Sequence, residues 1–386
     1  MTSKGQKLRF IHTSDLQLGM TRHFLSSEAQ ARFTQDRIDA IRTIGQLATE
    51  READFVVVAG DVFESNHLTR QTVVRAVDAL QSLPVPVFLL PGNHDPLDAS
   101  SLFNTAPFVD QNSNVTVIRD SAPVQLPGRP DIEVVGAPWT SKRPVTDICG
   151  AMLDSLSPTS GVVRVAVAHG QVDRLSPDIT RPDVIDLAKA EQALTDGRIS
   201  YLALGDRHSA TAVGESGAVW YSGAPVATDF DEVRPNQALL VEIAKGAKPT
   251  VEELPVGQWH FIRDEKSIHD SSDVAQVREW LDALPDKERT VLKIAFTGTV
   301  NIETAGELDA VLADFGDHFA SLRQWDRKSD WVVAPDALDE NSIALSGYAK
   351  RAWDELIGNA KDEGDDASEA QDALALFYRL AREGAE

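Results

Sequence analysis

The stretch "VPVFLLPGNHD", residues 85–95, decides how the chain folds. Its apolar run is typical of a buried strand, and the polar GNHD that follows is typical of a loop. The same arrangement occurs earlier, in "DFVVVAGD" at 54–61, between helical patterns at 28–52 and 69–83. Strands that alternate with amphipathic helices predict an α/β protein with a layered sheet core.

Metal-capable side chains follow five of the β-like runs. In folds of this class the reactive groups collect on loops at the carboxyl ends of strands. Carboxylates, neutral imidazoles and amide oxygens are the donors that two closely spaced divalent ions need, with one carboxylate between them. Glycines beside these residues allow tight turns and a close backbone approach. The polar positions are Asp15 and Gln17, Asp61, Asn93 and His94, His169, and Asp206 and His208.

The composition limits the class of protein. The chain has 386 residues, 42% of them hydrophobic, and a single cysteine, Cys149. One cysteine excludes an internal disulfide and a zinc ribbon, and it fits a reducing, cytoplasmic setting. The apolar runs are too short to span a membrane, and the N-terminus has no apolar export signal.

The net charge of −23 is unevenly distributed. Residues 1–90 hold 10 basic and 10 acidic side chains, whereas residues 257–386 hold 14 basic and 28 acidic ones. A protein with this excess of acidic side chains does not bind nucleic acid through the electrostatic field of its whole surface. The neutral N-terminal region still leaves room for a DNA-binding face, because bound metal ions add local positive charge.

The pattern of elements changes near residue 257. Before it come further β-like runs, including "VVRVAVAHG", "ISYLALGD" and "QALLVEIA". Beyond it we expect strands near 259–264, 289–298 and 320–333 and helices at 272–284 and 303–316, which predict a second, smaller α/β unit. A helix at 345–358, an acidic linker and an amphipathic terminal helix with Ala373, Leu374, Leu376, Phe377 and Leu380 complete the chain.

The ordered motifs resemble a known family. They are "HTSDLQLG", "VVVAGDVFESN", "LLPGNHDP", "VAVAHGQVD", "YLALGDRHSA" and "VWYSGAP". The set is similar to the calcineurin-like metallophosphoesterases, and most similar to the SbcD-type DNA-repair nuclease subunits among them. The resemblance covers residues 8–256 well and implies a layered metallophosphoesterase sandwich at 1–256, a cap domain at 257–333 and a helical tail with an acidic linker at 334–386.

The resemblance also implies roles for individual residues. Asp61 would bridge two divalent ions, and His94 would face the scissile phosphate without binding metal. Asp95 would orient His94, an assignment that rests on its position alone. The first ion would lie among Asp15, Gln17, Asp61 and His208, and the second among Asp61, Asn93, His169 and Asp206.

Two positions depart from the family pattern. Gln17 and Asp206 stand where the family usually has histidine, so that five oxygen donors accompany only two imidazoles. Oxygen-rich sites favour manganese or magnesium over zinc. The substitutions therefore predict a centre that prefers manganese, with magnesium, iron or zinc as alternatives, and a weaker first site. His12, three residues before Asp15, is predicted to be a structural histidine.

The function implied is metal-dependent phosphodiester hydrolysis on DNA, as the nuclease subunit of an ATPase-coupled repair complex. The terminal helix has the layout of a segment that docks on an SbcC-type ATPase, although a helix folded back on its own core would look the same. The chain is also predicted to be a possible homodimer. Two rival functions remain: a phosphodiesterase of small molecules such as nucleotides, which the acidic surface favours, and a structural or regulatory subunit with a degraded metal centre.

Overall fold

The structure is a computed structural model and describes residues 7–109, 113–176, 178, 180–244, 247–333, 347–360, 370, 373 and 377. Inter-residue contacts divide the chain into two compact units, Met1–Trp259 and His260–Glu386. None of the described helices combines the length and the apolar content that crossing a bilayer requires.

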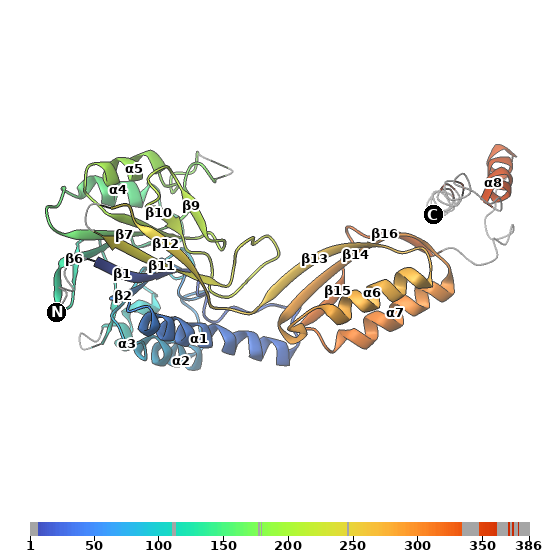
Figure 1. The fold of residues 1–386 in the computed structure, drawn as a ribbon, viewed down its shortest axis with the longest axis horizontal. Coiled ribbons are helices and arrows are strands. Elements are labelled where there is room, and N and C mark those ends of the chain that lie inside the picture. Colours follow the sequence, from blue (N-terminus) through green and yellow to red (C-terminus); the bar gives the residue numbers. More distant parts are fainter. Residues whose placement is uncertain are drawn as a thin grey trace. The chain divides into compact units, whose positions relative to one another are not determined.

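The first unit is built on two six-stranded sheets, visible in Figure 1. The first sheet has the order β12-β11-β1-β2-β3-β4. Its strands are β1 Lys7–Thr13, β2 Phe55–Val58, β3 Val87–Leu89, β4 Val115–Val117, β11 Gln237–Ala244 and β12 Thr250–Pro255. The second has the order β5-β6-β7-β8-β10-β9. Its strands are β5 Val124–Leu126, β6 Arg129–Gly136, β7 Val163–His169, β8 Tyr201–Gly205, β9 Thr211–Val213 and β10 Val219–Tyr221.

Strand β2 shows why the sheets stack in layers. Its four residues are apolar and buried, and successive side chains point to opposite faces of a strand. Phe55 and Val57 belong to a core that both sheets share, whereas Val56 and Val58 belong to a core with helices of the outer layer. A strand that is apolar on both faces therefore needs a cover on each side, and the layered α/β prediction is confirmed.

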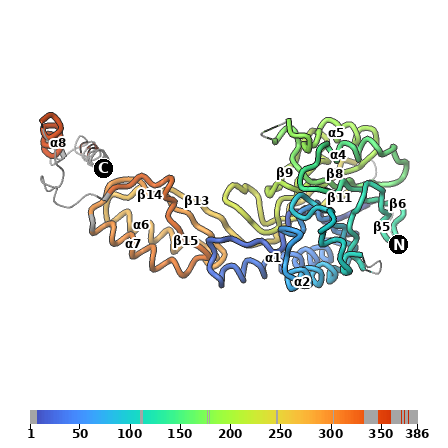
Figure 2. Tube along the Cα trace, turned by 180° about the vertical axis from the view of Figure 1, so that it is seen from behind, coloured from blue at the N-terminus to red at the C-terminus, as the bar shows by residue number. Residues whose placement is uncertain are grey.

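Helices cover the outer face of each sheet (Figures 1 and 2). On the first sheet lie α1 (Ser27–Glu50), α2 (Arg70–Gln81) and the short α3 (Ala106–Val109). On the second lie α4 (Ile148–Ser155) and α5 (Leu187–Thr195), whose apolar side chains form a separate core with strands β7 and β8. Strands β1, β2 and β3 run parallel in one sheet, and β6, β7, β8 and β10 run parallel in the other.

The second unit contains a parallel sheet with two helices. Its elements are β13 His260–Ser267, α6 Ser271–Ala283, β14 Thr290–Val300, α7 Ile302–Gly316, β15 Ser321–Gln324 and β16 Asp330–Val333. Leu292, Ile294 and Phe296 of β14 pack in one core with Leu281 of α6 and Leu308 of α7.

One strand prediction in this unit was wrong. The single strand expected at 320–333 is two short strands, β15 and β16, which pair with different halves of β14. Residues 325–329 leave the sheet between them, and the backbone N–H of Trp325 donates to the Ile294 carbonyl where the first strand ends. An apolar pattern does not reveal such a break, because both pieces contact the same neighbouring strand.

The tail contains helix α8, Gly347–Ala360, close to the predicted 345–358. Trp353 of this helix is buried and lies with its ring 5.6 Å from that of Phe377. Of the apolar positions predicted for a terminal helix, Ala373 and Phe377 are helical. Leu374, Leu376, Leu380 and the acidic linker at 361–369 lie outside the described residues.

Candidate metal centre

The predicted site residues all follow strands that end at one edge of the two sheets. Asp15 and Gln17 follow β1, Asp61 follows β2, and Asn93 to Asp95 follow β3. His169 ends β7 in the other sheet, and Asp206 and His208 follow β8. Because the two sheets pack face to face, their carboxyl-terminal loops meet, and residues up to 193 positions apart in the chain come into range of one another.

The backbone at these loops is unusual. Asp15, Gln17, Asp61 and Asp206 have positive φ angles of 54°, 43°, 52° and 96°. Non-glycine residues adopt this region rarely and at an energetic cost, so such residues cluster where side-chain placement matters for function. Four of the seven predicted ligands have this backbone conformation. The fold therefore holds their side chains in place at the expense of local stability.

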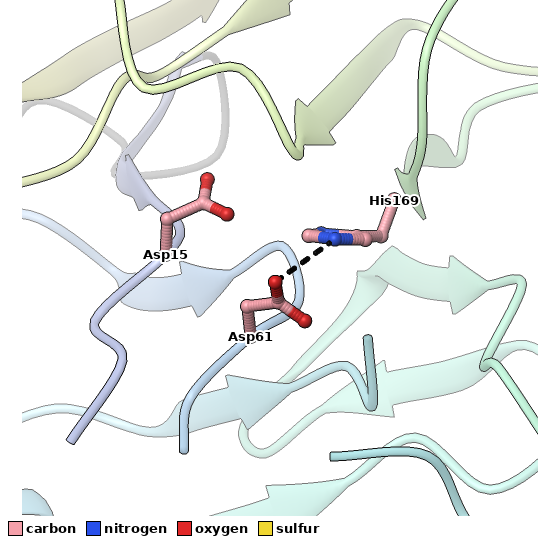
Figure 3. A group of neighbouring side chains, drawn as sticks. All are labelled: Asp15, Asp61 and His169. Atoms are coloured by element: carbon pink, nitrogen blue, oxygen red, sulfur yellow. Dashed lines mark ion pairs between the residues drawn. The ribbon is translucent and has the colours of Figure 1, made fainter. Parts of the chain in front are cut away.

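One group of donors surrounds His169. Its Nε2 atom lies 2.8 Å from Asn93 Oδ1, 3.4 Å from Asp61 Oδ2 and 3.9 Å from Asp206 Oδ1. Figure 3 shows His169 and Asp61 facing each other, with Asp15 alongside. One donor atom from each of these three residues lies within 4.8 Å of the others, and all three residues are buried. That spacing suits ligands of a common cation.

A second group surrounds His208. Its Nε2 atom lies 3.7 Å from Asp15 Oδ1 and 3.4 Å from the amide nitrogen of Gln17. Asp15 belongs to both groups, because it lies close to His208 and also in the cluster with Asp61 and His169. His169 and His208 lie in different groups, and the assignment of each residue to one of two ions stays a prediction.

The electrostatics of the site favour a bound cation. Burial acts to lower the pKa of His169, but Asp61, Asp15 and Asp206 outweigh it and raise that pKa well above its usual value. For Asp15 burial raises the pKa, and His208 and His169 act against it. Three carboxylates around one buried imidazole therefore attract a positive charge, which either a proton or a metal ion can supply.

Two further observations fit a metal. Gln17 Oε1 and Asp206 Oδ2 are buried oxygens without a hydrogen-bond partner among the described residues. An unpaired buried acceptor is costly and calls for a partner that the polypeptide does not provide. A divalent ion that prefers oxygen donors would satisfy both atoms, so the residues present fit the two ions that the sequence predicts.

The imidazoles of His169 and His208 are each oriented by hydrogen bonds at Nδ1, the nitrogen that does not face the donor groups. His169 Nδ1 donates to the Ala59 carbonyl at 2.9 Å, and the indole N–H of Trp139 donates to the His169 carbonyl at 2.7 Å. Gly60 makes this approach possible, because a Cβ at that position would lie 2.1 Å from His169 Nδ1. With Nδ1 occupied, Nε2 is the nitrogen that faces the site, as expected for a ligating histidine.

Glu232 and Thr228 contact the centre, and the sequence did not single them out. His208 Nδ1 lies 2.8 Å from Glu232 Oε1 and 2.7 Å from Thr228 Oγ1. The Thr228 N–H also donates to Glu232 at 2.9 Å. Glu232 lies 24 residues beyond His208 in an irregular segment, so no spacing in the sequence marks it.

The "YSGAP" motif supports the two halves of the site. The Tyr221 hydroxyl donates to the Gly170 carbonyl at 2.8 Å and accepts from the Val172 N–H at 2.9 Å, which braces the loop after His169. Ser222 lies 2.8 Å from Ser14 Oγ, and Ser14 in turn donates to the Asp15 carboxylate. Tyr221 and Ser222 of this motif therefore support the loops that carry His169 and Asp15.

His94 and Asp95 lie at the edge of the centre. His94 Nδ1 donates to the Glu64 carbonyl at 3.1 Å, and its Nε2 lies 4.0 Å from Asp61 Oδ2. Asp95 is fully buried, and its two oxygens accept from the backbone N–H groups of Phe63 and Gly92 at 2.9 and 2.8 Å. Asp95 therefore ties the loop after β2 to the loop that carries His94, so any influence on His94 passes through the backbone.

Two cavities open at the centre. One of about 470 Å³ is lined by Gln17, His94 and His208 together with acidic side chains, and the other, of about 180 Å³, is lined by Asn93 and Asp206. Asp206 and Gln171 line both. A substrate can therefore reach the donor groups from solvent on either side.

Comparisons with known proteins agree with this geometry. The family model described as calcineurin-like phosphoesterase matches residues 8–241. The D subunit of the nuclease SbcCD from Escherichia coli (strain K12) is 26% identical over 317 residues, covering 71% of this chain and 74% of the relative. The protein of the same name from Bacillus subtilis (strain 168) is 22% identical over 97% of this chain and 98% of its own length. The DNA double-strand break repair protein Mre11 of Archaeoglobus fulgidus is 34% identical over 91 residues, 23% of this chain and 19% of the relative.

Proposed function

Because the chain belongs to the calcineurin-like phosphoesterase family, we propose that it is a metal-dependent phosphodiesterase that cleaves DNA. The observation that carries the proposal is the pair of donor groups around His169 and His208, which meet at Asp15. DNA as the substrate is supported by the relatives, which are named as nuclease and DNA-repair proteins.

Seven residues would hold two divalent ions, with Asp61 between them. Bound there, such ions supply Lewis-acid stabilisation of charge on a phosphate and lower the pKa of water. Five oxygen donors against two imidazoles favour manganese or magnesium over zinc. The first set is Asp15, Gln17, Asp61 and His208, and the second is Asp61, Asn93, His169 and Asp206.

His94 is the proposed proton donor to the leaving oxygen. Its Nδ1–H is engaged by the Glu64 carbonyl, so Nε2 is the atom that faces the site and can hold the proton. Asp95 would keep His94 in place by joining its loop to Phe63. Buried Asp61, whose Oδ1 accepts from the His94 backbone N–H at 3.0 Å, links the same loop to the donor groups.

The rest of the chain would serve this reaction in a complex. Residues 257–333 would form a cap domain that helps to hold DNA, and residues 334–386 a tail that docks on an SbcC-type ATPase. The relative from Bacillus subtilis, named as a subunit of SbcCD and aligned over 97% of this chain, supports that partnership. The cytoplasmic location and a homodimer stay predictions.

The test is hydrolysis of a phosphodiester dye and of labelled linear DNA by the full chain, each with manganese, magnesium or zinc. We expect manganese-dependent cleavage of both, lost by at least about 100-fold in His94→Ala. His318→Ala is the control with the dye, which does not depend on the proposed DNA-holding domain, because His318 is an exposed histidine of the second unit. Full DNA cleavage by His94→Ala would contradict the role given to His94.

The two other functions predict different results. A small-molecule phosphodiesterase is favoured by the acidic lining of the larger cavity, which includes Asp229 and Asp231, and would cleave the dye but not DNA even with its ATPase added. A degraded centre at Gln17 and Asp206 would leave both substrates intact with every metal. Restoring activity with the double change Gln17→His and Asp206→His would then identify the cause.

A further inference from the structure

We propose that the smaller cavity binds the phosphate next to the scissile one in a DNA strand, through Lys142, Arg181 and Gln171. The inference rests on the proposed phosphodiesterase function and adds a substrate-binding site to it. The cavity of about 180 Å³ also touches Asn93 and Asp206, so a group bound in it is adjacent to the second set of metal donors.

The cavity is assembled from four separate loops. The lining residues are Asn93 after β3, Trp139 and Lys142 after β6, Gly170, Gln171, Arg181, Asp183 and Val184 after β7, and Asp206 after β8. Trp139 is buried beneath it and hydrogen-bonded to the His169 carbonyl, which gives the cavity a firm wall. A pocket with a fixed wall and two basic side chains in its lining can accept a compact anion such as a phosphate.

Its cations have the right chemistry for phosphate. Lys142 is exposed and carries a flexible ammonium group. Arg181 is held by Asp183, with Nε 3.0 Å from Oδ1 and Nη2 2.5 Å from Oδ2, and this ion pair fixes the direction of the guanidinium. Since a guanidinium has five N–H donors, this pairing leaves others for a ligand. Asp183 and Asp206 are the acidic groups of the lining, and Asp206 would be engaged by metal.

Gln171 adds a neutral contact. Its Oε1 atom is buried without a hydrogen-bond partner among the described residues, and the side chain lines both cavities. A rotation of the amide by 180° would put its NH₂ group in the place of this unpaired oxygen, where it could donate to a phosphate oxygen.

The larger cavity is more acidic than the smaller one. The larger cavity is lined by Glu64, Asp229, Asp231 and Glu232. Two arginines, Arg22 and Arg207, also line it, but its acidic groups outnumber its basic ones, whereas the smaller cavity has two of each. A phosphate would therefore be more favourable in the smaller cavity than in the larger one, so the strand would leave the metal centre towards Lys142.

The experiment compares three thymidine dinucleotides that differ in one terminal phosphate: none, on the 5′ end, or on the 3′ end. With manganese, we expect the wild-type chain to show a KM roughly tenfold lower for one phosphorylated form, because one added cation–phosphate contact is worth about that much. The double variant Lys142→Ala and Arg181→Ala should lose this preference. Arg143→Ala is the matched control, since Arg143 is an exposed neighbour that does not line the cavity.

Binding of the same dinucleotides, measured by calorimetry on His94→Ala with manganese, gives a second readout. Equal affinities for the three forms, or a preference that survives the double variant, would overturn the inference. A preference for a nucleoside diphosphate over every dinucleotide would assign the cavity to a small nucleotide instead of a strand. If the wild-type chain cleaves no substrate, the proposed function fails, while the binding preference still decides the role of the cavity.

Discussion

The Nδ1 atom of His208 lies 2.8 Å from Oε1 of Glu232, so a carboxylate outside the set of donors orients one of the two imidazoles. Glu232→Gln removes the negative charge from this contact. Because a carboxylate that orients a ligating histidine typically contributes about 10–100-fold to metal affinity, we expect about a tenfold loss of manganese affinity at the first site alone. Calorimetric titration that resolves the two ions measures it.

Glu215→Gln is the control for this change, since Glu215 is an exposed glutamate on the loop between β9 and β10. A weaker second site with an unchanged first site would contradict the assignment of His208 to the first ion.

The position of the Asp61 side chain requires a glycine at residue 92. A Cβ at Gly92 would lie 2.2 Å from Asp61 Oδ1 and 2.5 Å from the Asp61 backbone nitrogen. Gly92→Ala must therefore displace the Asp61 carboxylate, which is proposed to bridge the two ions, and we expect manganese stoichiometry to fall from two to one or less. Gly306→Ala, where nothing lies within 4 Å, should bind two ions and be as stable as the wild type or more so. Two ions bound to Gly92→Ala would show that Asp61 is not shared.

Asp95 accepts two backbone hydrogen bonds in a fully buried position. In Asp95→Asn the side-chain NH₂ would face one of these N–H donors, leaving a buried group unsatisfied. The expected loss in the free energy of unfolding is about 1–3 kcal/mol, measured by urea denaturation. Asp120→Asn, at an exposed turn, should change it by less than about 0.5 kcal/mol.

His12 predicts a pH dependence of stability. It is fully buried and hydrogen-bonded to Tyr201 and Leu204, and burial lowers its pKa to about 3 from 6.5, with the Leu204 bond acting the other way. Between these values the unfolded chain binds a proton that the folded chain does not, so stability falls as the pH falls below 6.5. The contribution is about 1.4 kcal/mol per pH unit.

The check is the free energy of unfolding of the wild type and His12→Gln at about pH 7 and about pH 5, both with chelator. The wild type should lose about 2 kcal/mol more than the variant over this range. Other histidines are common to both proteins and cancel in the difference. Equal losses in the two proteins would mean that His12 takes up a proton in the folded state.

Removal of metal should destabilise the first unit. Asp15, Asp61 and Asp206 repel one another, and a ligand that binds only the folded state stabilises it by about 2.7 kcal/mol at about 100 times its Kd. We therefore expect the melting temperature to fall with chelator and to rise again with manganese more than with zinc. In Asp61→Asn the manganese effect should be smaller. A larger rise with zinc would refute the manganese preference.

The sequence by itself determined the local elements and the chemistry of the loops. Strand β11 was predicted at 237–244 and is found there, because its apolar pattern is set by residues next to one another in the chain. The polar motif after each strand could be identified for the same reason. The donor types, including the oxygen-rich substitutions at Gln17 and Asp206, are likewise a property of the sequence alone.

Only the tertiary structure decided which of these residues meet and what supports them. The separation of donors around His169 and His208 depends on two sheets packing face to face, and no spacing in the chain encodes it. Glu232, Tyr221 and the backbone contacts of Asp95 act across the fold in the same way. Long-range contacts are selected by the packing of whole layers, which is why the sequence predicts what the site is made of and the fold determines how it is held.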